Sequence, residues 1–378
     1  MAKPLTVDRL RRMAIAASFG APTTLGGAMR RLGFVQADPI RAPARAQDLI
    51  LRHRVADYRI GDAERRFARL GLEEDFLYAY GVMAHETWRL LHPRHDDADE
   101  TGRHVPDALA AAVLAFVRER GSAHPRDLEA AFGRERAVNG WGGWSKATTR
   151  ALQRLQYYGL LRVTARQDGI RIYAPATAPD ERLSAAERTR RLLALTVRIL
   201  APMPERSLAQ VAGLLRRAAP DLTDASDAVA ALLASGALER GEAEGERYLW
   251  PPGLAAREPA RMVRLLAPFD PLVWDRRRFE ALWQWEYRFE AYTPPKQRRF
   301  GYYAMPLLWG GDVIGWANVT ARDGEVDVGL GFAGRAPRGR DFRAALDEEV
   351  ARMEAFFTPR TPARGASPDS DSSRDSDR

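Results

Sequence analysis

Residues 141–173 read WGGWSKATTRALQRLQYYGLLRVTARQDGIRIY. Leucines in the first part of this stretch recur at helical spacing, which predicts a helix ending near Leu161. Two short segments rich in apolar residues follow at 160–163 and 170–173, and the Asp168-Gly169 pair between them favours a tight hairpin turn. A helix that leads directly into a two-stranded hairpin forms the second half of a winged helix.

The chain contains this pattern twice. Helices predicted at 109–119 and from His124 precede the quoted stretch, so three helices and a hairpin predict a winged helix over 107–178. The same order of three helices and two short strands recurs over 185–256. We therefore expect tandem winged helices, a helix-turn-helix arrangement that commonly places its third helix in the major groove of DNA.

The N-terminal segment 1–106 predicts a third helical unit that resembles a winged helix less closely. It begins with a helix capped at Thr6 and continues with a second helix at 25–32. Residues 34–38 look extended, because the residue that precedes a proline is disfavoured in helical geometry. We expect a long helix over 72–91 to follow.

The composition changes in the C-terminal part of the chain. Tryptophan, tyrosine and phenylalanine crowd into 274–316, and Gly310-Gly311 separates two predicted strands of a hairpin. Residues 257–360 are therefore expected to form an aromatic-rich β module that ends in a helix. Residues 361–378 are rich in Ser, Asp and Arg, so we expect a disordered tail.

The 378-residue chain is basic, with a net charge of +8. Only Lys3, Lys146 and Lys296 are lysines among its 58 basic residues. Arginine makes bidentate contacts with phosphates and guanine edges, so this balance is compatible with nucleic acid binding. A coding sequence of high GC content gives the same bias, so the composition alone does not establish a DNA-binding function.

The composition also excludes several classes of protein. The chain has no cysteine, which excludes disulfides, thiolate zinc sites and iron–sulfur clusters. Its six histidines form no HExxH pattern, so we expect neither a metal nor a cofactor. There is no apolar run of 18 residues and no hydrophobic signal core at the N-terminus. We expect a soluble, cytoplasmic protein that associates with the nucleoid and not with membranes.

Four ordered blocks resemble the YcaQ/AlkZ-type DNA glycosylases. Residues 34–40 read FVQADPI, with Arg45 downstream, and resemble the Gln-x-Asp version of the catalytic motif of this family. The other three blocks are AHE at 84–86, PFDPLVWDR at 268–276 and the EAYTP…R…GYYAMP segment at 290–306. The sequence departs from the family pattern at four positions, namely Met83, Thr87, Ala267 and Met305.

The resemblance implies an α+β fold in which winged-helix motifs and a C-terminal β-barrel-like module form a C shape around a concave DNA-binding surface. It also implies a DNA glycosylase that repairs bulky alkyl adducts and interstrand crosslinks, with double-stranded DNA carrying alkylated or crosslinked guanine as its partner. Within the family, the Gln-x-Asp type is associated with a broader substrate range than the Gln-x-Gln type, which is linked to antibiotic self-resistance.

The motif contains the residue types that this reaction requires. An N7-alkylguanine is already cationic, so the barrier lies in stabilising an oxocarbenium-like sugar and delivering water to C1′. We expect Asp38 to act as general base or electrostatic stabiliser and Gln36 to hold the water, because residues i and i+2 of an extended segment project to one face. No lysine lies near the motif in sequence, which favours a monofunctional, hydrolytic enzyme. In the alternative interpretation Asp38 only caps a turn before Pro39.

A second group of residues is predicted to contact DNA. Arg45 is expected near a phosphate at the lesion, and His85 beside the catalytic site. Basic residues interleaved with aromatics form a predicted phosphate-binding patch. The members of this patch are Lys296, Arg298, Arg299 and Tyr302. In the alternative interpretations His85 only hydrogen-bonds a neighbouring loop, and the patch is a solvated edge of the β module.

A crosslinked guanine cannot be fully extruded from the duplex, because its partner strand is attached. We therefore expect an open cleft at Asp38 rather than the enclosed pocket that most base-flipping enzymes use. Two alternatives remain: a non-enzymatic winged-helix regulator that prefers one DNA sequence, and a degenerate family member that binds lesions without cutting. The protein is expected to be a monomer.

Overall fold

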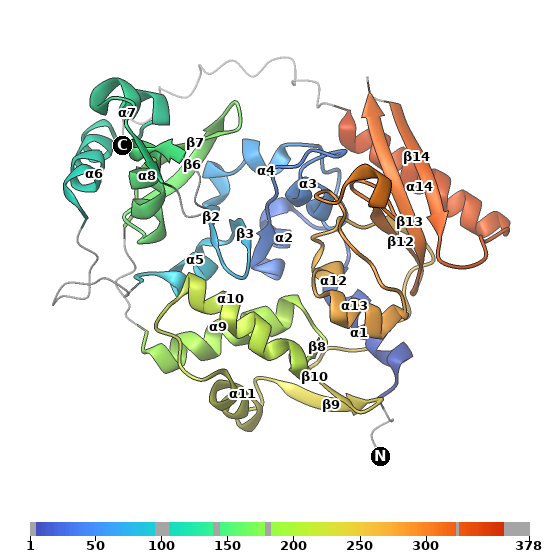
Figure 1. The fold of residues 1–378 in the computed structure, drawn as a ribbon. Coiled ribbons are helices and arrows are strands. Elements are labelled where there is room, and N and C mark those ends of the chain that lie inside the picture. The colour runs from blue at the N-terminus through green and yellow to red at the C-terminus, as the bar shows by residue number, and fades with distance from the viewer. Residues whose placement is uncertain (1–4, 95–105, 139–143, 178–182, 323–324, 359–378) are drawn as a thin grey trace, which may run out of the picture.

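The computed structural model describes residues 5–94, 106–138, 144–177, 183–322 and 325–358. In Figure 1 the N-terminal unit (blue) lies in the middle, with residues 106–177 (green), 183–256 (yellow) and the C-terminal module (orange to red) around it. Among the described helices none is both long enough and apolar enough to cross a membrane. The predicted tail at 361–378 lies outside the described residues.

The first helices of the N-terminal unit begin and end where the sequence predicts. Helix α1 (Val7–Ser18) is capped by the Thr6 side chain, and α2 (Leu25–Leu32) is capped in the same way by Thr24. Gly33 ends α2 with a φ of +73°, a conformation that favours glycine, and strand β1 (Phe34–Gln36) follows at once. The remaining short helices of this unit are α3 (Ala46–Leu51), α4 (Asp62–Arg65) and the 3₁₀ turn η1 (Ala68–Leu70).

The predicted long helix over 72–91 is wrong. This segment forms strand β2 (Glu73–Phe76), strand β3 (Tyr80–Met83) and the short helix α5 (His85–Leu91). The strands form an antiparallel sheet in the order β1-β3-β2. Gly81 lies opposite Gln36, where an added Cβ would stand 2.3 Å from the carbonyl oxygen of Val35, so the close pairing of β1 with β3 requires a glycine.

The unit at 106–177 has the predicted order of helices and hairpin. Both residues of the hairpin turn have positive φ, +53° at Asp168 and +80° at Gly169, as a type I′ turn demands. The elements are α6 (Ala108–Arg120), α7 (Pro125–Phe132), β4 (Arg136–Val138), β5 (Trp144–Lys146), α8 (Ala147–Tyr157), β6 (Leu161–Gln167) and β7 (Ile170–Pro175). The assignment of this unit as a winged helix that binds DNA stays a prediction.

The third unit repeats the order with one additional strand. Its sheet runs β8-β10-β9, so the short strand after the first helix pairs with the hairpin. The elements are α9 (Ala185–Ile199), β8 (Met203–Pro204), η2 (Glu205–Ser207), α10 (Leu208–Ala218), α11 (Ala225–Ala234), β9 (Glu239–Ala243) and β10 (Glu246–Trp250).

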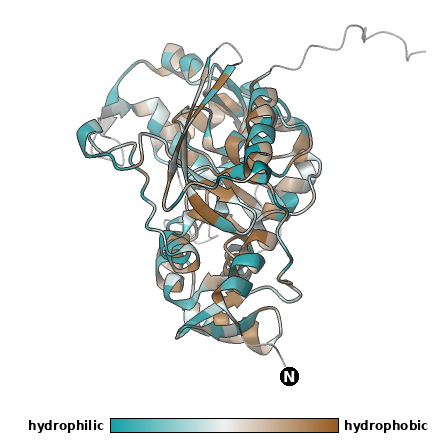
Figure 2. Cartoon of the chain, turned by 90° about the vertical axis from the view of Figure 1, so that its right-hand side faces the viewer, coloured by the Kyte–Doolittle hydropathy of each residue, from teal (hydrophilic) through white to brown (hydrophobic). Residues whose placement is uncertain are grey.

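The C-terminal module is an open antiparallel sheet rather than a closed barrel. Its order is β11-β12-β13-β14, and the two outer strands do not pair with each other. Figure 1 shows α14 lying along this sheet, and in Figure 2 the helix carries both hydrophilic and hydrophobic turns, as expected for a helix with one buried face. The elements are β11 (Val263–Leu265), α12 (Pro271–Trp274), α13 (Arg276–Trp283), η3 (Pro295–Gln297), β12 (Met305–Trp309), β13 (Asp312–Arg322), β14 (Glu325–Phe332) and α14 (Arg340–Phe357).

The N-terminal unit and the C-terminal module share one hydrophobic core. Val35 and Leu49 belong to the same buried cluster as Leu265 and Met305 of the sheet. Beside this core the guanidinium of Arg54 donates two hydrogen bonds, of 2.8 and 2.9 Å, to the carboxylate of Asp270, and both side chains are fully buried.

A second set of buried charges joins the N-terminal unit to the other units. Strand β2 carries three consecutive carboxylates, Glu73, Glu74 and Asp75, all of them buried. Each is paired with arginine: Glu73 with Arg162 at 2.9 Å, Glu74 with Arg166 at 2.6 Å, and Asp75 with Arg94 at 3.0 Å. Because Arg162 and Arg166 lie on β6, these pairs hold the hairpin β6–β7 against β2.

We predict that Arg54→Met strongly destabilises the protein. The substitution leaves the carboxylate of Asp270 buried without its counter-charge, which costs about 3–5 kcal/mol. Denaturant unfolding is the measurement, and the double variant Arg54→Met/Asp270→Asn should lose less than the sum of the two single losses. Arg12→Met is the control, because the ion pair of Arg12 with Glu258 is largely exposed and should matter little. Equal stability of Arg54→Met and wild type would contradict the prediction.

Candidate functional site

Gln36 and Asp38 lie at the point where β1 leaves the sheet. Gln36 is the last residue of β1 and pairs with Gly81 of β3. The next residue, Ala37, donates its N–H to the carbonyl oxygen of Tyr80 at 3.0 Å, so the backbone between the two motif residues is still held by the sheet. Asp38 then begins the loop that leads to α3. Both side chains are half-buried.

The carboxylate of Asp38 is partly shielded from water and accepts one hydrogen bond from the backbone. Burial raises its pKa above the usual value, and the hydrogen bond from the N–H of Ile40 to Oδ1, at 2.9 Å, opposes this effect. A carboxylate with a raised pKa accepts a proton more readily than an exposed one. The Ile40 contact is the turn-capping bond of the alternative interpretation, so Asp38 caps this turn with one oxygen.

Gln36 contributes a polar atom that has no partner. Its Oε1 is buried and no atom of the described residues donates a hydrogen bond to it. Most buried side-chain oxygens in proteins are hydrogen-bonded to protein or to ordered water. The amide oxygen of Gln36 is therefore available to a water or a ligand.

Tyr303 is a neighbour of Asp38 that the motif analysis did not assign to the site. Its ring is buried in the core shared with Val35, and it meets the ring of Phe289 edge-on at 5.4 Å. Burial raises the pKa of its hydroxyl, and the negative charge of Asp38 raises it further. Tyr303 belongs to the GYYAMP block that resembles the family sequence, but only the folded chain brings this tyrosine within range of the charge of Asp38.

The predicted basic and aromatic patch forms one structured segment. The carboxylate of Glu290 accepts hydrogen bonds from the backbone N–H groups of residues 299, 300 and 301, which fixes this segment. Arg298 lies 5.0 Å above the ring of Tyr302, which is 42% exposed. Lys296 and Arg299 are exposed as well. The structure thus gathers the four predicted residues on the segment that also carries Tyr303.

Lys296 bears on the expectation that no lysine lies near the Gln36–Asp38 motif. It is far from Asp38 in the chain, but it lies on the same segment as Tyr303, whose hydroxyl senses the charge of Asp38. Distance along the sequence is therefore no longer a reason to exclude a lysine nucleophile. Lys146, by contrast, lies at the start of α8 in another unit and is paired with Glu129.

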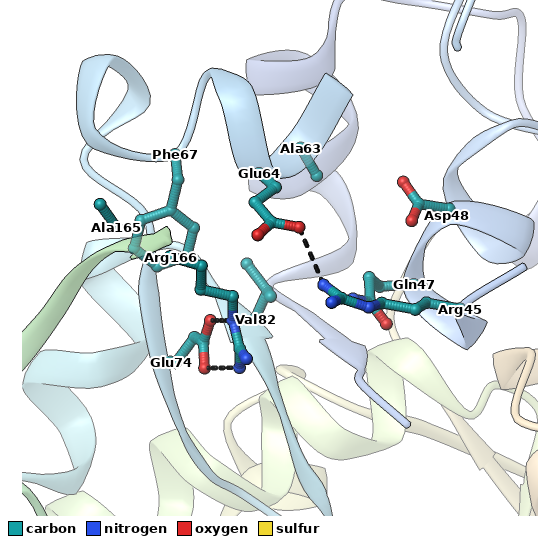
Figure 3. A pocket seen from close by; sticks show the side chains of 10 residues that line it. All are labelled: Arg45, Gln47, Asp48, Ala63, Glu64, Phe67, Glu74, Val82, Ala165 and Arg166. Atoms are coloured by element: carbon teal, nitrogen blue, oxygen red, sulfur yellow. Dashed lines mark hydrogen bonds and ion pairs between the residues drawn. The ribbon is translucent and has the colours of Figure 1, made fainter. Parts of the chain in front are cut away.

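Arg45 lies between the Asp38 loop and the hairpin β6–β7. It occupies the residue before α3 and forms an ion pair with Glu64 at 2.8 Å. Figure 3 shows this pair and the bidentate pair of Arg166 with Glu74 on two sides of a small cavity of about 20 Å³. A larger pocket of about 530 Å³ adjoins it, lined by Arg41 and Arg45 and by the turn residues 168 and 169.

His85 does not lie with Asp38. In the pairing of β1 with β3, Gln36 is opposite Gly81 and Phe34 is opposite Met83. Asp38 therefore follows one end of this ladder, and His85 follows the other. Nδ1 of His85 is 3.0 Å from a carboxylate oxygen of Glu73, and its half-exposed ring stacks on Trp88. The structure supports the local hydrogen-bonding interpretation of His85 and does not place it beside the catalytic motif.

Within the described ranges, no group of three or more histidine, aspartate, glutamate or cysteine side chains could hold a metal ion. The arrangement instead offers a carboxylate of raised proton affinity and, two residues before it, an unpartnered amide oxygen. An exposed basic segment and a pocket lined by two arginines and three carboxylates complete the charged groups of the site. These are the components of a hydrolytic site that acts on a polyanion.

Two comparisons with known proteins agree with this arrangement. The family described as DNA glycosylase AlkZ-like matches residues 29–356, which include the Gln36–Asp38 motif and the segment at 290–306. Among solved structures, the Streptomyces sahachiroi DNA glycosylase AlkZ is similar with a TM-score of 0.62 and 15% sequence identity, over 94% of this chain and 97% of that chain. At this identity the structural likeness shows a common fold. Because the family match spans most of the chain, the protein belongs to the AlkZ-like family of DNA glycosylases.

Proposed function

We propose that this DNA glycosylase is monofunctional and hydrolyses the N-glycosidic bond of N7-alkylguanine, including bulky and interstrand-crosslinked adducts. The observation that carries the proposal is the half-buried carboxylate of Asp38, whose pKa is raised, two residues from the unpartnered amide oxygen of Gln36. We propose that Asp38 accepts the proton of the attacking water and that the amide oxygen of Gln36 accepts a hydrogen bond from the same water.

The reaction then needs no acid to expel the base. The bond between C1′ and N9 breaks with both electrons going to the cationic N7-alkylguanine, which leaves as a neutral base. Ionised Asp38 stabilises the positive charge that develops on the sugar and takes a proton from the water as its oxygen bonds to C1′. The products are an abasic sugar with a hydroxyl at C1′, the free alkylguanine and a proton that passes from Asp38 to solvent.

The charged residues around the motif suit a DNA duplex. Arg41 and Arg45 line the pocket beside the Asp38 loop together with three carboxylates, Asp48, Glu64 and Asp168. The segment with Lys296, Arg298 and Arg299 also carries Tyr303, whose hydroxyl senses the charge of Asp38. Contacts of this kind with phosphates position the duplex without reading its sequence. We propose that these side chains grip the backbone on both sides of the lesion, and that the protein acts as a monomer in the nucleoid.

An open site supports the extension to bulky adducts. Pro39 and Arg41, which follow Asp38, are exposed, so the loop meets solvent on one side. The buried ring of Tyr303 and the partly buried ring of Phe289 pack edge-on in the core that also contains Val35, just before the motif. An adduct that stays tethered to the opposite strand can be accepted only from the exposed side.

The rival interpretation is a regulator without enzymatic activity. Membership of a glycosylase family argues against it. The presence of both Gln36 and Asp38 argues against the second rival, a degenerate family member that binds lesions without cutting. A regulator would bind one DNA sequence tightly and release no base from any duplex.

The first prediction concerns the two motif residues. On a duplex with a single N7-methylguanine, wild type should leave an abasic site that alkali converts to a strand break. Asp38→Asn should lower the single-turnover rate by about 10²–10⁴-fold, because the general base is lost, and Gln36→Ala should lower it as well. Affinity for the duplex should stay unchanged in a mobility-shift assay. Asp347→Asn, on the exposed face of α14, is the matched control. Wild-type rates in a pure Asp38→Asn preparation would refute the assignment.

A second prediction concerns pH. Asp38 must be ionised to act, and burial raises its pKa above 3.8, the ordinary value for aspartate. Activity should therefore be constant at neutral pH and fall as the pH drops through this raised pKa. Single-turnover rates between pH 4 and pH 8, about the range that brackets a shifted carboxyl group, provide the measurement after subtraction of enzyme-free depurination. A rate that stays constant down to about pH 4 would contradict a base whose pKa is raised.

A third prediction separates hydrolysis from lyase chemistry. A lysine nucleophile would form a Schiff base that borohydride traps as a protein–DNA adduct. We expect no trapped adduct and no strand break without alkali, because Asp38 rather than Lys296 supports the reaction. The same assay with a nitrogen-mustard crosslink should release the two strands from each other. An adduct that forms with wild type and is lost in Lys296→Met would show a lyase instead.

A further inference from the structure

A second large pocket, of about 460 Å³, lies on the far side of strand β11 from the shared core. Val263 and Leu265 of this strand are buried in that core. Arg264 stands between them, so strand alternation directs its side chain to the opposite face, where it lines the pocket. Among the described residues, none lines both this β11 pocket and the pocket beside the Asp38 loop. The β11 pocket is therefore separate from the candidate site.

Four arginine side chains converge on the β11 pocket. Arg52, which follows α3, Arg264 of β11 and Arg352 of α14 line it. The fully buried Arg54 lies close behind, because its guanidinium and that of Arg264 are each 4.6 Å from the centre of the Phe19 ring. The Phe19 ring also lines the pocket. Three separate segments of the chain thus bring positive charge to one place.

Buried carboxylates neutralise only half of this charge. Among the described residues, the buried carboxylates that act on Arg264 are Asp270 and Glu349. Asp270 is bound by Arg54. Glu349 is divided: one oxygen accepts from Arg52 and from the N–H of Leu265, and the other accepts from Arg352 at 2.9 Å. Four guanidinium groups against two carboxylates leave an excess of two positive charges.

The exposed groups at the rim do not remove this excess. Glu258 lines the pocket, but its carboxylate is 77% exposed and is bound by Arg12 at 2.6 Å. Glu348 is 68% exposed and lies 3.7 Å from Arg352. Arg257, also exposed, lines the rim as a further cation. The rim therefore carries as many arginines as carboxylates, and exposed pairs of this kind are weak.

Two buried N–H donors of the pocket residues have no partner. They are Nη1 of Arg264 and Nε of Arg52, whose side chain is only 3% exposed. A buried donor without an acceptor is unfavourable, and more so on a charged group. Burial lowers the pKa of Arg264 to about 10, which still leaves it protonated at neutral pH. These donors and the excess charge call for an anion that the chain does not supply.

His53 lines the same pocket without adding charge. Burial, and next the charge of Arg52, hold the pKa of its imidazole well below the ordinary value, so the ring is neutral at neutral pH. Its Nε2 lies 2.9 Å from the carbonyl oxygen of Leu265 and donates to it. The arginines alone therefore provide the positive charge of the pocket.

We propose that the β11 pocket binds a phosphate dianion, either inorganic phosphate or a small phosphate monoester, through Arg264 and Arg52. A dianion matches the excess of two charges, whereas a phosphodiester of the DNA backbone carries only one. The planar guanidinium group suits phosphate oxygens, with which it forms strong charge-assisted hydrogen bonds. The volume falls in the usual range for small-molecule sites. This inference does not depend on the roles proposed for Gln36 and Asp38.

The test is a calorimetric titration of the full chain with inorganic phosphate and, separately, with deoxyadenosine 5′-monophosphate. Both are largely dianions at about pH 8, and chloride keeps the ionic strength equal. We expect wild type to bind with one ligand per chain. Arg264→Met should bind about 10- to 100-fold more weakly, because it lacks a charge-assisted hydrogen bond. Arg261→Met should bind as wild type does, because Arg261 is exposed and pairs with Asp341 at 3.7 Å.

Thermal unfolding separates binding from a purely structural role of Arg264. Phosphate should raise the midpoint of wild type and of Arg261→Met, and should leave that of Arg264→Met unchanged. Without phosphate the midpoint of Arg264→Met should not fall, because the variant loses a buried charge that has no partner. Arg264→Gln provides the same comparison if the methionine variant does not fold.

The outcomes distinguish the possible ligands. Tighter binding of the nucleotide than of phosphate would identify an organic monoester, and equal binding would show that the phosphate group alone is recognised. Failure of wild type to bind either ligand would overturn the proposal, as would equal binding by a folded Arg264→Met. Loss of duplex affinity in Arg264→Met without binding of either small ligand would assign the pocket to the DNA interface and also overturn it. Base release from the N7-methylguanine duplex should be the same in Arg264→Met and wild type, so the glycosylase proposal is tested separately.

Discussion

The buried ion pair between Arg54 and Asp270 is the interaction on which the site depends. It joins residues that are 216 positions apart, and neither side chain is exposed. Asp270 also caps α12 through Leu272, and Arg54 donates to the carbonyl oxygens of Ser18 and Ile50. The pair thus ties the end of α1, the end of α3 and the start of α12 to one point. The junction joins the N-terminal unit, which carries Asp38, to the C-terminal module, which carries Tyr303.

Charge pairs also determine how the other units attach. An interface made only of leucine and valine can slide, whereas a buried carboxylate must meet its arginine or lose several kcal/mol, about the cost of breaking a buried pair. Strand β2 places Glu73, Glu74 and Asp75 in a row, and Arg162 and Arg166 bring β6 to it in one register. We infer that the many arginines of this protein serve docking between units as well as contact with DNA. This dual use explains why the composition alone could not establish a DNA-binding function.

The candidate site combines contributions from distant parts of the chain. β1 supplies Gln36, the loop after it supplies Asp38, Arg41 and Arg45, and the C-terminal module supplies Tyr303 with the basic segment. Backbone pairing of β1 with β3 fixes Gln36, and packing against the ring of Phe289 fixes Tyr303. Gln36 therefore lies on a strand and Asp38 on the loop that follows it, while Arg41, Lys296 and Arg299 are exposed.

The sequence by itself determined the features that depend on neighbours along the chain. Capping by Thr6, the turn at Asp168-Gly169, the extended Gln36 and the order of helices and hairpins follow from local spacing and backbone preference. Only the tertiary structure decided the rest. The segment 72–91 forms two strands and a short helix rather than one long helix, and the three carboxylates of its first strand are paired with arginines from elsewhere in the chain. Tyr303 lies beside Asp38 and His85 lies away from it, because strand register and long-range ion pairs place them, and neither can be read from spacing in the sequence.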